Sequence, residues 1–141
     1  MALIVKRSRL PGAGLGLFTT RAIREGSKII EYRGEIIGYS EYRRRARYEQ
    51  DQYLFYVRRD RCIDAMHTPQ YKARYANDAE GIVRRRGVKN NSDYVIYDDQ
   101  CFIVASRDIR AGEEIYVNYT QHYWKAMRRR AQKARQLSRK K

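Results

Sequence analysis

Apolar segments in this chain are short, and residues that favour turns separate them. Runs of three to six strand-type residues recur as far as residue 118, and only one short polar helix interrupts them, from an expected N-cap at Ser40 through Tyr48. The predicted strands cover residues 3–6, 28–32, 35–37, 53–57, 61–65, 94–97, 101–106 and 114–118. Because these strands do not alternate with helices of 10–15 residues, the sequence predicts a mostly β fold and disfavours a nucleotide-binding α/β sheet.

Local turn signals predict how six of these strands pair. Arg33-Gly34 separates 28–32 from 35–37, and Gly34 suits a turn because glycine tolerates positive φ. Two further hairpins are predicted, one across residues 58–60 and one across Asp98-Asp99.

The charge balance is strongly basic. Among 141 residues, 31 Lys and Arg face 16 Asp and Glu, which gives a net charge of +15. Such a charge favours anionic partners, including nucleic acid, although a solubilising excess is the simpler alternative. Residues 125–141 carry nine Lys or Arg and no acid, so we expect one domain over 1–122 and a basic helical tail over 123–141 that closes a site or binds a polyanion.

Other features narrow the class of protein. No apolar run approaches the roughly 20 residues of a membrane span, and the first ten residues reverse the order of a secretory signal, so no membrane partner is expected. Cys62 and Cys101 are 39 residues apart and belong to no CxxC pair, so no zinc site is expected. Both lie in apolar segments typical of buried free thiols, which indicates an intracellular, reducing compartment.

A glycine-dense segment, PGAGLGLF, follows the first strand. Gly12, Gly14 and Gly16 suggest a dinucleotide fingerprint, but Leu17 stands where its third glycine belongs and no long helix follows. The glycines are explained either by structural turns or by a backbone that approaches a ligand closely.

Several segments together resemble the SET domain, the family of protein lysine methyltransferases. The matching segments, in order, are GLGLF at 14–18, EYRGE at 31–35, YLFYV at 53–57, CIDA at 62–65, ARYANDA at 73–79, VASRDIRAGEEI at 104–115 and VNYTQHYW at 117–124. Each is weak alone, but their order and spacing make the joint match specific. The resemblance implies a β-clip fold, with several short-stranded sheets around a pseudoknot.

The resemblance also implies a methyl donor, S-adenosyl-L-methionine, and no metal. The donor-binding residues would be Ala13, Gly14, Leu15, Gly16, Asn77, Asp78, Tyr119 and Trp124. Asp78 departs from the usual His, which puts donor affinity in doubt, and an ordinary Asx turn is the alternative for Asn77-Asp78. Trp124 would either stack on the adenine or simply anchor the tail helix.

The resemblance implies that the catalytic residue is the tyrosine that ends the family motif GEExxxxY, which is Tyr119 in this chain. Tyr32 and Tyr94 are expected to line the lysine channel beside it, with Tyr53 a weaker candidate, and Val117 occupies a position that tunes the number of methyl groups added. A lysine has a pKa of about 10.4, so the site must favour its neutral form, and an apolar channel beside the donor's sulfonium does this. Tyrosine hydroxyls orient an amine without adding charge; core packing is the alternative for each tyrosine.

The sequence therefore predicts an S-adenosylmethionine-dependent protein-lysine N-methyltransferase acting on a histone or another basic chromatin protein. It would lie at chromatin in a eukaryotic nucleus, or in a bacterial cytoplasm. Two alternatives remain open: a nucleic-acid-binding module that uses the basic tail, and a SET-like module that binds its ligands without catalysis.

Overall fold

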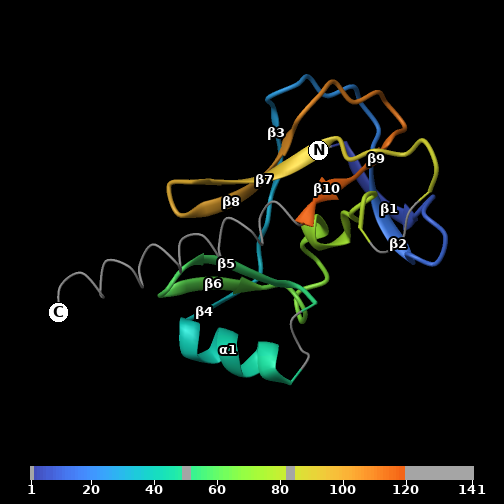
Figure 1. Ribbon diagram of the computed structural model, residues 1–141. Helices are drawn as coiled ribbons and strands as arrows, with labels where there is room; N and C mark the ends of the chain where they lie inside the picture. The colour runs from blue at the N-terminus through green and yellow to red at the C-terminus, as the bar shows by residue number, and fades with distance from the viewer. Residues whose placement is uncertain (1, 49–51, 82–84, 120–141) are drawn as a thin grey trace, which may run out of the picture.

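The computed structural model describes residues 2–48, 52–81 and 85–119. The predicted basic helix, and with it the boundary at residue 122, lies outside these residues. Ten short strands, one α-helix and one 3₁₀ helix make up the described fold (Figure 1). They are β1 (Leu3–Arg7), β2 (Leu15–Thr19), β3 (Lys28–Glu31), β4 (Glu35–Ile37), α1 (Tyr39–Arg47), β5 (Leu54–Arg58), β6 (Arg61–Asp64), η1 (Lys72–Tyr75), β7 (Ser92–Tyr97), β8 (Gln100–Ala105), β9 (Glu114–Ile115) and β10 (Val117–Asn118).

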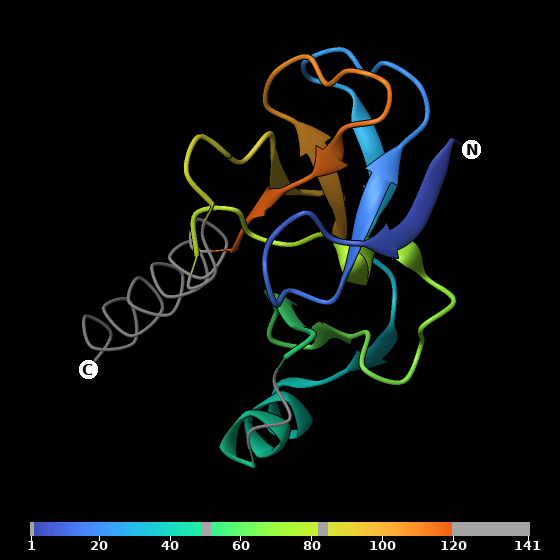
Figure 2. The same ribbon diagram turned by 90° about the vertical axis from the view of Figure 1, so that its right-hand side faces the viewer.

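The strands form three small sheets, as the mostly β prediction requires. Their strand orders are β1-β2-β9, β10-β7-β8-β3 and β4-β6-β5. Figure 1 shows α1 beneath the β4-β6-β5 sheet, and Figure 2 shows the other two sheets above it.

Two of the three strand pairings that were predicted from local turn signals are confirmed. β5 pairs with β6 and β7 pairs with β8, each antiparallel. Asp98 and Asp99 have φ of 50° and 64°, the two positive values that a two-residue type I′ hairpin turn requires.

The predicted pairing of residues 28–32 with 35–37 is wrong. β3 pairs with β8, whereas β4 pairs with β6, so the chain crosses from one sheet to another at this point. Gly34 is not among the residues with positive φ; instead, a Cβ there would overlap the Asp64 carbonyl. Glycine is needed for close backbone approach and not for a tight turn.

Three boundaries differ from the sequence prediction. α1 begins at Tyr39 with Gly38 as its N-cap and no side-chain cap, so Ser40 lies inside the first turn. The glycine-dense segment continues directly into β2, because residues 15–19 pair with β1 and residues 17 and 18 also pair with β9. The predicted strand 114–118 is two strands, β9 and β10, which belong to different sheets.

Residues 116–118 run between two segments that precede them in the chain. On one side the Val117 N–H donates to the Asn77 carbonyl at 2.8 Å, and on the other Val117 pairs with Ser92 in parallel register. Asn77 and Ser92 are the first and last residues of the segment 77–92. The last strand therefore lies between the two ends of this segment. This is the threaded arrangement expected from the resemblance.

The main hydrophobic core lies where the sheets meet. It joins fully buried side chains such as Leu17, Ile103 and Ile115 to the aromatic residues Tyr32, Phe55 and Tyr94. The tyrosines predicted for the site are therefore continuous with the core.

Candidate active site

Three of the predicted tyrosines come together around one phenylalanine. The Tyr94 ring stacks against Tyr119 with 6.0 Å between centroids, and it meets Tyr32 edge-on at 5.9 Å. Phe55 lies 5.0 Å from Tyr94 and 5.6 Å from Tyr32. The residues come from β7, the end of β3, β5 and the segment after β10, so four distant parts of the chain build one aromatic cluster.

Two hydroxyl protons in this cluster are directed to backbone carbonyls. The Tyr32 hydroxyl donates to the Tyr53 carbonyl at 2.8 Å, and the Tyr119 hydroxyl donates to the Ala76 carbonyl. Each phenol oxygen therefore keeps its lone pairs for a further donor, such as the N–H of an amine. Tyr119 is 43% exposed, which leaves the cluster accessible on that side.

The cluster holds its tyrosines in the neutral form. Burial raises the pKa of Tyr32, of Tyr94 and of Tyr119, and for Tyr119 the nearby Asp78 carboxylate raises the pKa further. For Tyr32 and Tyr94 the proximity of Tyr119 adds to the effect. At neutral pH these phenols add no negative charge that would stabilise a lysine ammonium.

Tyr53 has a different position from the other three tyrosines. Its ring lies under the Arg74 guanidinium at 4.1 Å, and its carbonyl holds the Tyr32 hydroxyl. Arg74 is itself fixed by the Ala65 and Met66 carbonyls at 2.7 and 2.8 Å. Tyr53 thus supports the cluster from its edge.

Val117 lies in the core beneath the cluster. It is fully buried and belongs to the same group of packed residues as Tyr94. Its role in setting the number of methyl groups stays a prediction.

The glycine turn presents an open face beside this cluster. Gly12 and Gly14 have φ of 73° and 74°, and a Cβ at either would meet nothing within 4 Å. Leu15 is 50% exposed. Glycine is required at these two positions by conformation, and the space on the Cβ side of each is open.

Asn77 joins the glycine turn to the tyrosine cluster. Its side-chain amide donates to the Leu15 carbonyl at 3.0 Å, while the carbonyl of its neighbour Ala76 accepts the Tyr119 hydroxyl. The predicted donor-binding turn and the predicted catalytic tyrosine are therefore linked through two consecutive residues.

Glu114, to which the sequence assigned no role, organises the back of the turn. Its carboxylate is 2% exposed and accepts four hydrogen bonds. The donors are the Ser8 hydroxyl at 2.6 Å, the Arg9 N–H at 2.8 Å, the Tyr116 hydroxyl at 2.9 Å and the Asn77 amide at 3.4 Å. A Cβ at Gly16 would overlap this carboxylate, so Gly16 supports the turn from behind.

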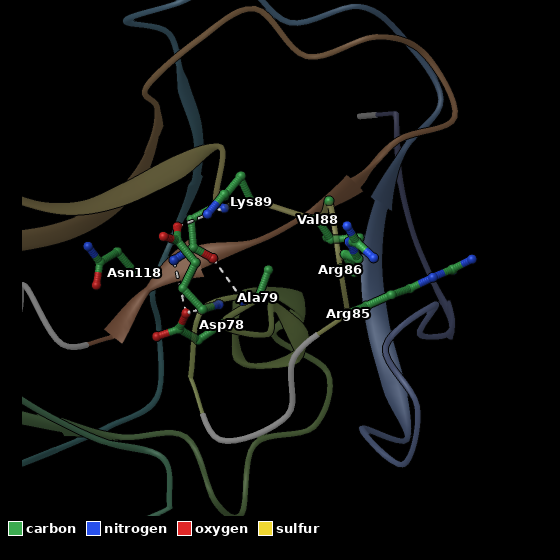
Figure 3. Close-up of a pocket in the computed structure, with 10 residues that line it drawn as sticks. Asp78, Ala79, Arg85, Arg86, Val88, Lys89 and Asn118 are labelled. Atoms are coloured by element: carbon green, nitrogen blue, oxygen red, sulfur yellow. Dashed lines mark hydrogen bonds between the residues drawn. The ribbon is translucent and has the colours of Figure 1, made fainter.

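Asp78 borders a hollow of about 520 Å³ that also touches Glu80, Asn90 and Asn118 (Figure 3). Arg85 lines the same hollow, but its side chain extends away from Asp78. The hollow shares Asp78 with the predicted donor-binding residues and does not include the glycine turn, so it is a neighbouring feature.

The remaining sequence predictions concern Trp124, metal binding, membrane spans and the two cysteines. Trp124 lies outside the described residues. Within the described ranges, no three His, Cys, Asp or Glu side chains gather as a metal site, and no helix has the length and apolarity to cross a membrane. Cys62 and Cys101 are both buried free thiols, as predicted, and burial raises the pKa of Cys101.

Known proteins similar to this chain carry lysine methyltransferase names. N-lysine methyltransferase KMT5A of Xenopus tropicalis is 29% identical over 123 residues, which cover 82% of this chain and 35% of that protein. Histone-lysine N-methyltransferase EZH2 of Chaetomium thermophilum is 32% identical over 133 residues, covering 86% and 8%. The H3 lysine-36 specific histone-lysine N-methyltransferase of Mus musculus is 33% identical over 111 residues, covering 75% and 4%. The chain thus spans about a third or less of the length of these relatives.

A solved structure agrees with this similarity. The chain matches a crystal structure of an active polycomb repressive complex 2 in the basal state, with a TM-score of 0.63 and 30% identity, over 84% of this chain and 15% of the other. The SET domain model matches residues 14–120, which include the glycine turn, the Asn77-Asp78 pair and Tyr119. The chain belongs to the SET domain family.

Proposed function

We propose that this chain is a protein-lysine N-methyltransferase that uses S-adenosyl-L-methionine. The observation that carries the proposal is the link through Ala76 and Asn77, which connects a cluster of neutral tyrosines to an open glycine turn. The names of the relatives support the same reaction.

The residues of the turn suit the donor. The main chain of Ala13, Gly14 and Leu15, together with Asn77, would hold it, because the space on the Cβ side of Gly14 is open. When bound, the donor supplies an electrophilic methyl group on a sulfonium cation. Trp124 stays a further candidate for its adenine.

The tyrosine cluster suits the acceptor amine. The Tyr119 and Tyr32 hydroxyls donate hydrogen bonds to backbone carbonyls, so their oxygens can accept a hydrogen bond from a neutral lysine amine. Such a bond would fix the direction of the lone pair on the amine nitrogen. A lysine in water is neutral in roughly one molecule in a few thousand at pH 7, and apolar surroundings raise that fraction. Catalysis then consists of desolvation and orientation, and needs no strong base.

The substrate we propose is a lysine of a histone or another basic chromatin protein, which is the substrate class in the names of two relatives. This predicts an intracellular enzyme, at chromatin in a eukaryotic cell. Contact between nucleic acid and residues 125–141 is part of the same proposal, and these residues lie outside the described structure.

Replacing Tyr119 tests the proposal. Wild-type protein is expected to transfer labelled methyl from S-adenosylmethionine to core histones or to lysine-rich peptides. Tyr119→Phe should lower the rate by about 100-fold, because removing one oriented hydrogen-bonding group at the reacting centre typically costs that much. Scintillation counting of the modified protein measures both rates.

The matched control is Tyr97→Phe, since Tyr97 lies on β7 outside the cluster and is 62% exposed. This variant should keep wild-type activity. Full activity of Tyr119→Phe would contradict the catalytic assignment, and a wild type that binds no donor in calorimetric titration would contradict the reaction itself.

A further inference from the structure

The Asp78 carboxylate accepts three hydrogen bonds from its own chain. Oδ1 accepts from the Asn90 side-chain amide at 2.9 Å and from the Glu80 N–H at 2.8 Å. Oδ2 accepts from the Tyr119 N–H at 3.1 Å. One side chain thus joins both ends of the loop after Asn77 to the backbone of the proposed catalytic residue.

Asn90 anchors this arrangement to the fold. Its Oδ1 accepts from the Ala79 N–H at 2.8 Å, so the Asn90 amide is oriented with its nitrogen toward Asp78. The next residue, Asn91, is 1% exposed and holds the Glu114–Tyr116 backbone through both ends of its side chain. Asp78 is therefore connected to the core through its partner.

The set of donors explains why an acid stands at this position. Asn90, Glu80 and Tyr119 all present N–H groups to residue 78. A neutral histidine offers a single acceptor nitrogen and a protonated one offers none, whereas a carboxylate offers two oxygens. The departure from the usual family residue is thus matched to its surroundings.

We propose that Asp78 is a positioning residue, which with Asn90 holds the backbone of Tyr119 so that its hydroxyl stays directed at the Ala76 carbonyl inside the tyrosine cluster. Tyr119 is then held at both ends, by its N–H and by its hydroxyl. This inference rests on the proposed methyl transfer, and it differs from the role in donor binding that the resemblance suggests for the side chain of Asp78.

Exchanging the two partners tests the proposal. In Asp78→Asn, one carbonyl oxygen must serve donors on two sides, so one hydrogen bond is lost. In Asn90→Asp, two carboxylates face each other. The double variant Asp78→Asn/Asn90→Asp restores the contact between the two side chains, because the new amide nitrogen at 78 donates to the acid at 90 while its oxygen still accepts from the Tyr119 N–H. Only the Glu80 N–H, which shares Oδ1 with Asn90 in the wild type, loses its acceptor.

Each single variant is expected to lower kcat on the order of 10-fold, since a small displacement of a catalytic group is costly. The double variant should recover most of the loss. Calorimetric affinity for S-adenosylmethionine and the thermal unfolding midpoint should stay near those of the wild type in Asp78→Asn. Asp98→Asn, at the tip of the β7-β8 hairpin, is the control for loss of one negative charge.

Hydrogen exchange of the Tyr119 amide, followed by NMR, reports the hydrogen bond between Asp78 and the Tyr119 N–H without an activity assay. Protection should fall about 10-fold in Asp78→Asn and return in the double variant. Three outcomes would each overturn the proposal. The first is a double variant in which the two losses of kcat simply multiply, and the second is weaker donor binding at unchanged kcat. The third is protection of the Tyr119 amide that does not depend on Asp78. If the wild type transfers no methyl group, the proposed reaction is wrong. The hydrogen-exchange result alone then shows whether Asp78 holds the Tyr119 backbone.

Discussion

Glu113 and Glu114 are adjacent and chemically identical, yet the fold gives them opposite environments. Glu114 is 2% exposed and accepts from four donors, whereas Glu113 accepts from the Arg110 N–H and lies 3.5 Å from Arg107 at the surface. Glu114 lies on β9, which pairs with β2 in a buried sheet, whereas Glu113 belongs to the turn before that strand. At this scale the identity of a residue matters less than the donors around it.

Glu114→Gln is expected to destabilise the fold by about 2 kcal/mol, because the amide places a donor where only donors converge. Affinity for S-adenosylmethionine should fall with it, since the carboxylate holds Asn77 and the segment before the glycine turn. Urea unfolding and calorimetric titration measure the two effects. Glu113→Gln is the matched control, and an equal loss in that variant would contradict the role of the buried carboxylate.

The site could be predicted from the sequence only where side chains form a recognisable motif. Tyr119, Asn77 and the glycine turn belong to such motifs, and the structure brings them together. The Ala76 carbonyl and the Asn90 amide were missed, because a backbone carbonyl leaves no side-chain signal and an asparagine in a polar loop resembles any other. Phe55 lay within a noted motif, YLFYV, but its contact with Tyr94 depends on the packing of separate sheets.

At the scale of the element, α1 is attached to its sheet by charge and by aromatic contacts, in which Tyr39 and Tyr42 pack against Tyr56 of β5. No residue of the helix is buried. Arg45 donates to Asp64 at 2.7 Å, to Glu35 at 2.9 Å and to Glu41 at 2.9 Å, so one guanidinium joins α1 to β6 and β4. These contacts lower the pKa of Glu35, and hydrogen bonds from Arg44 and then Arg45 lower that of Glu41 to about 2.

Arg45→Met is expected to lower the free energy of unfolding by about 3 kcal/mol, because it leaves the Asp64 carboxylate buried without its cation. Chemical denaturation measures the change. Arg44→Met removes an exposed partner of Glu41 and should change stability little. Similar losses in both variants would show that burial of Asp64 is not the cause.

Elements joined by local turns were predicted well, and elements with distant partners were not. The β7-β8 turn is specified by two aspartates that adopt positive φ, and its strands follow directly. β3 and β4 are also adjacent in sequence, but their partners lie on β8 and β6, tens of residues away. A local turn signal cannot compete with pairings that only the assembled core selects.

At the scale of the whole molecule, buried phenols and a buried thiol make folding sensitive to alkali. Burial raises the pKa of Tyr32, Tyr94, Tyr119 and Cys101. Above the pKa of these groups in the unfolded chain, about 8.5 for the thiol and 10 for the phenols, the unfolded state releases protons that the folded state retains. Stability is therefore complete at lower pH and is lost as pH rises.

The free energy of unfolding should fall steeply above about pH 10, and Tyr32→Phe should reduce the slope by about 1.4 kcal/mol per pH unit. Urea unfolding at a series of pH values measures this slope. The exposed Tyr97 supplies the control, because Tyr97→Phe should leave the slope unchanged. An identical slope in Tyr32→Phe and wild type would contradict the retention of the Tyr32 proton in the folded state.

The position of residues 116–118 between Asn77 and Ser92 also has a consequence for the order in which the parts of the chain fold. The contacts of this segment and its neighbours join residues far apart in sequence, such as Ser8 with Glu114 and Asn77 with Glu114. Contacts of this kind form slowly, because the intervening chain must first be brought together. The hairpins β5-β6 and β7-β8 need no such search. A chain that has folded these hairpins but not yet inserted this segment would have four of the ten described strands and an incomplete tyrosine cluster. The proposed methyl transfer would then be the last property to appear.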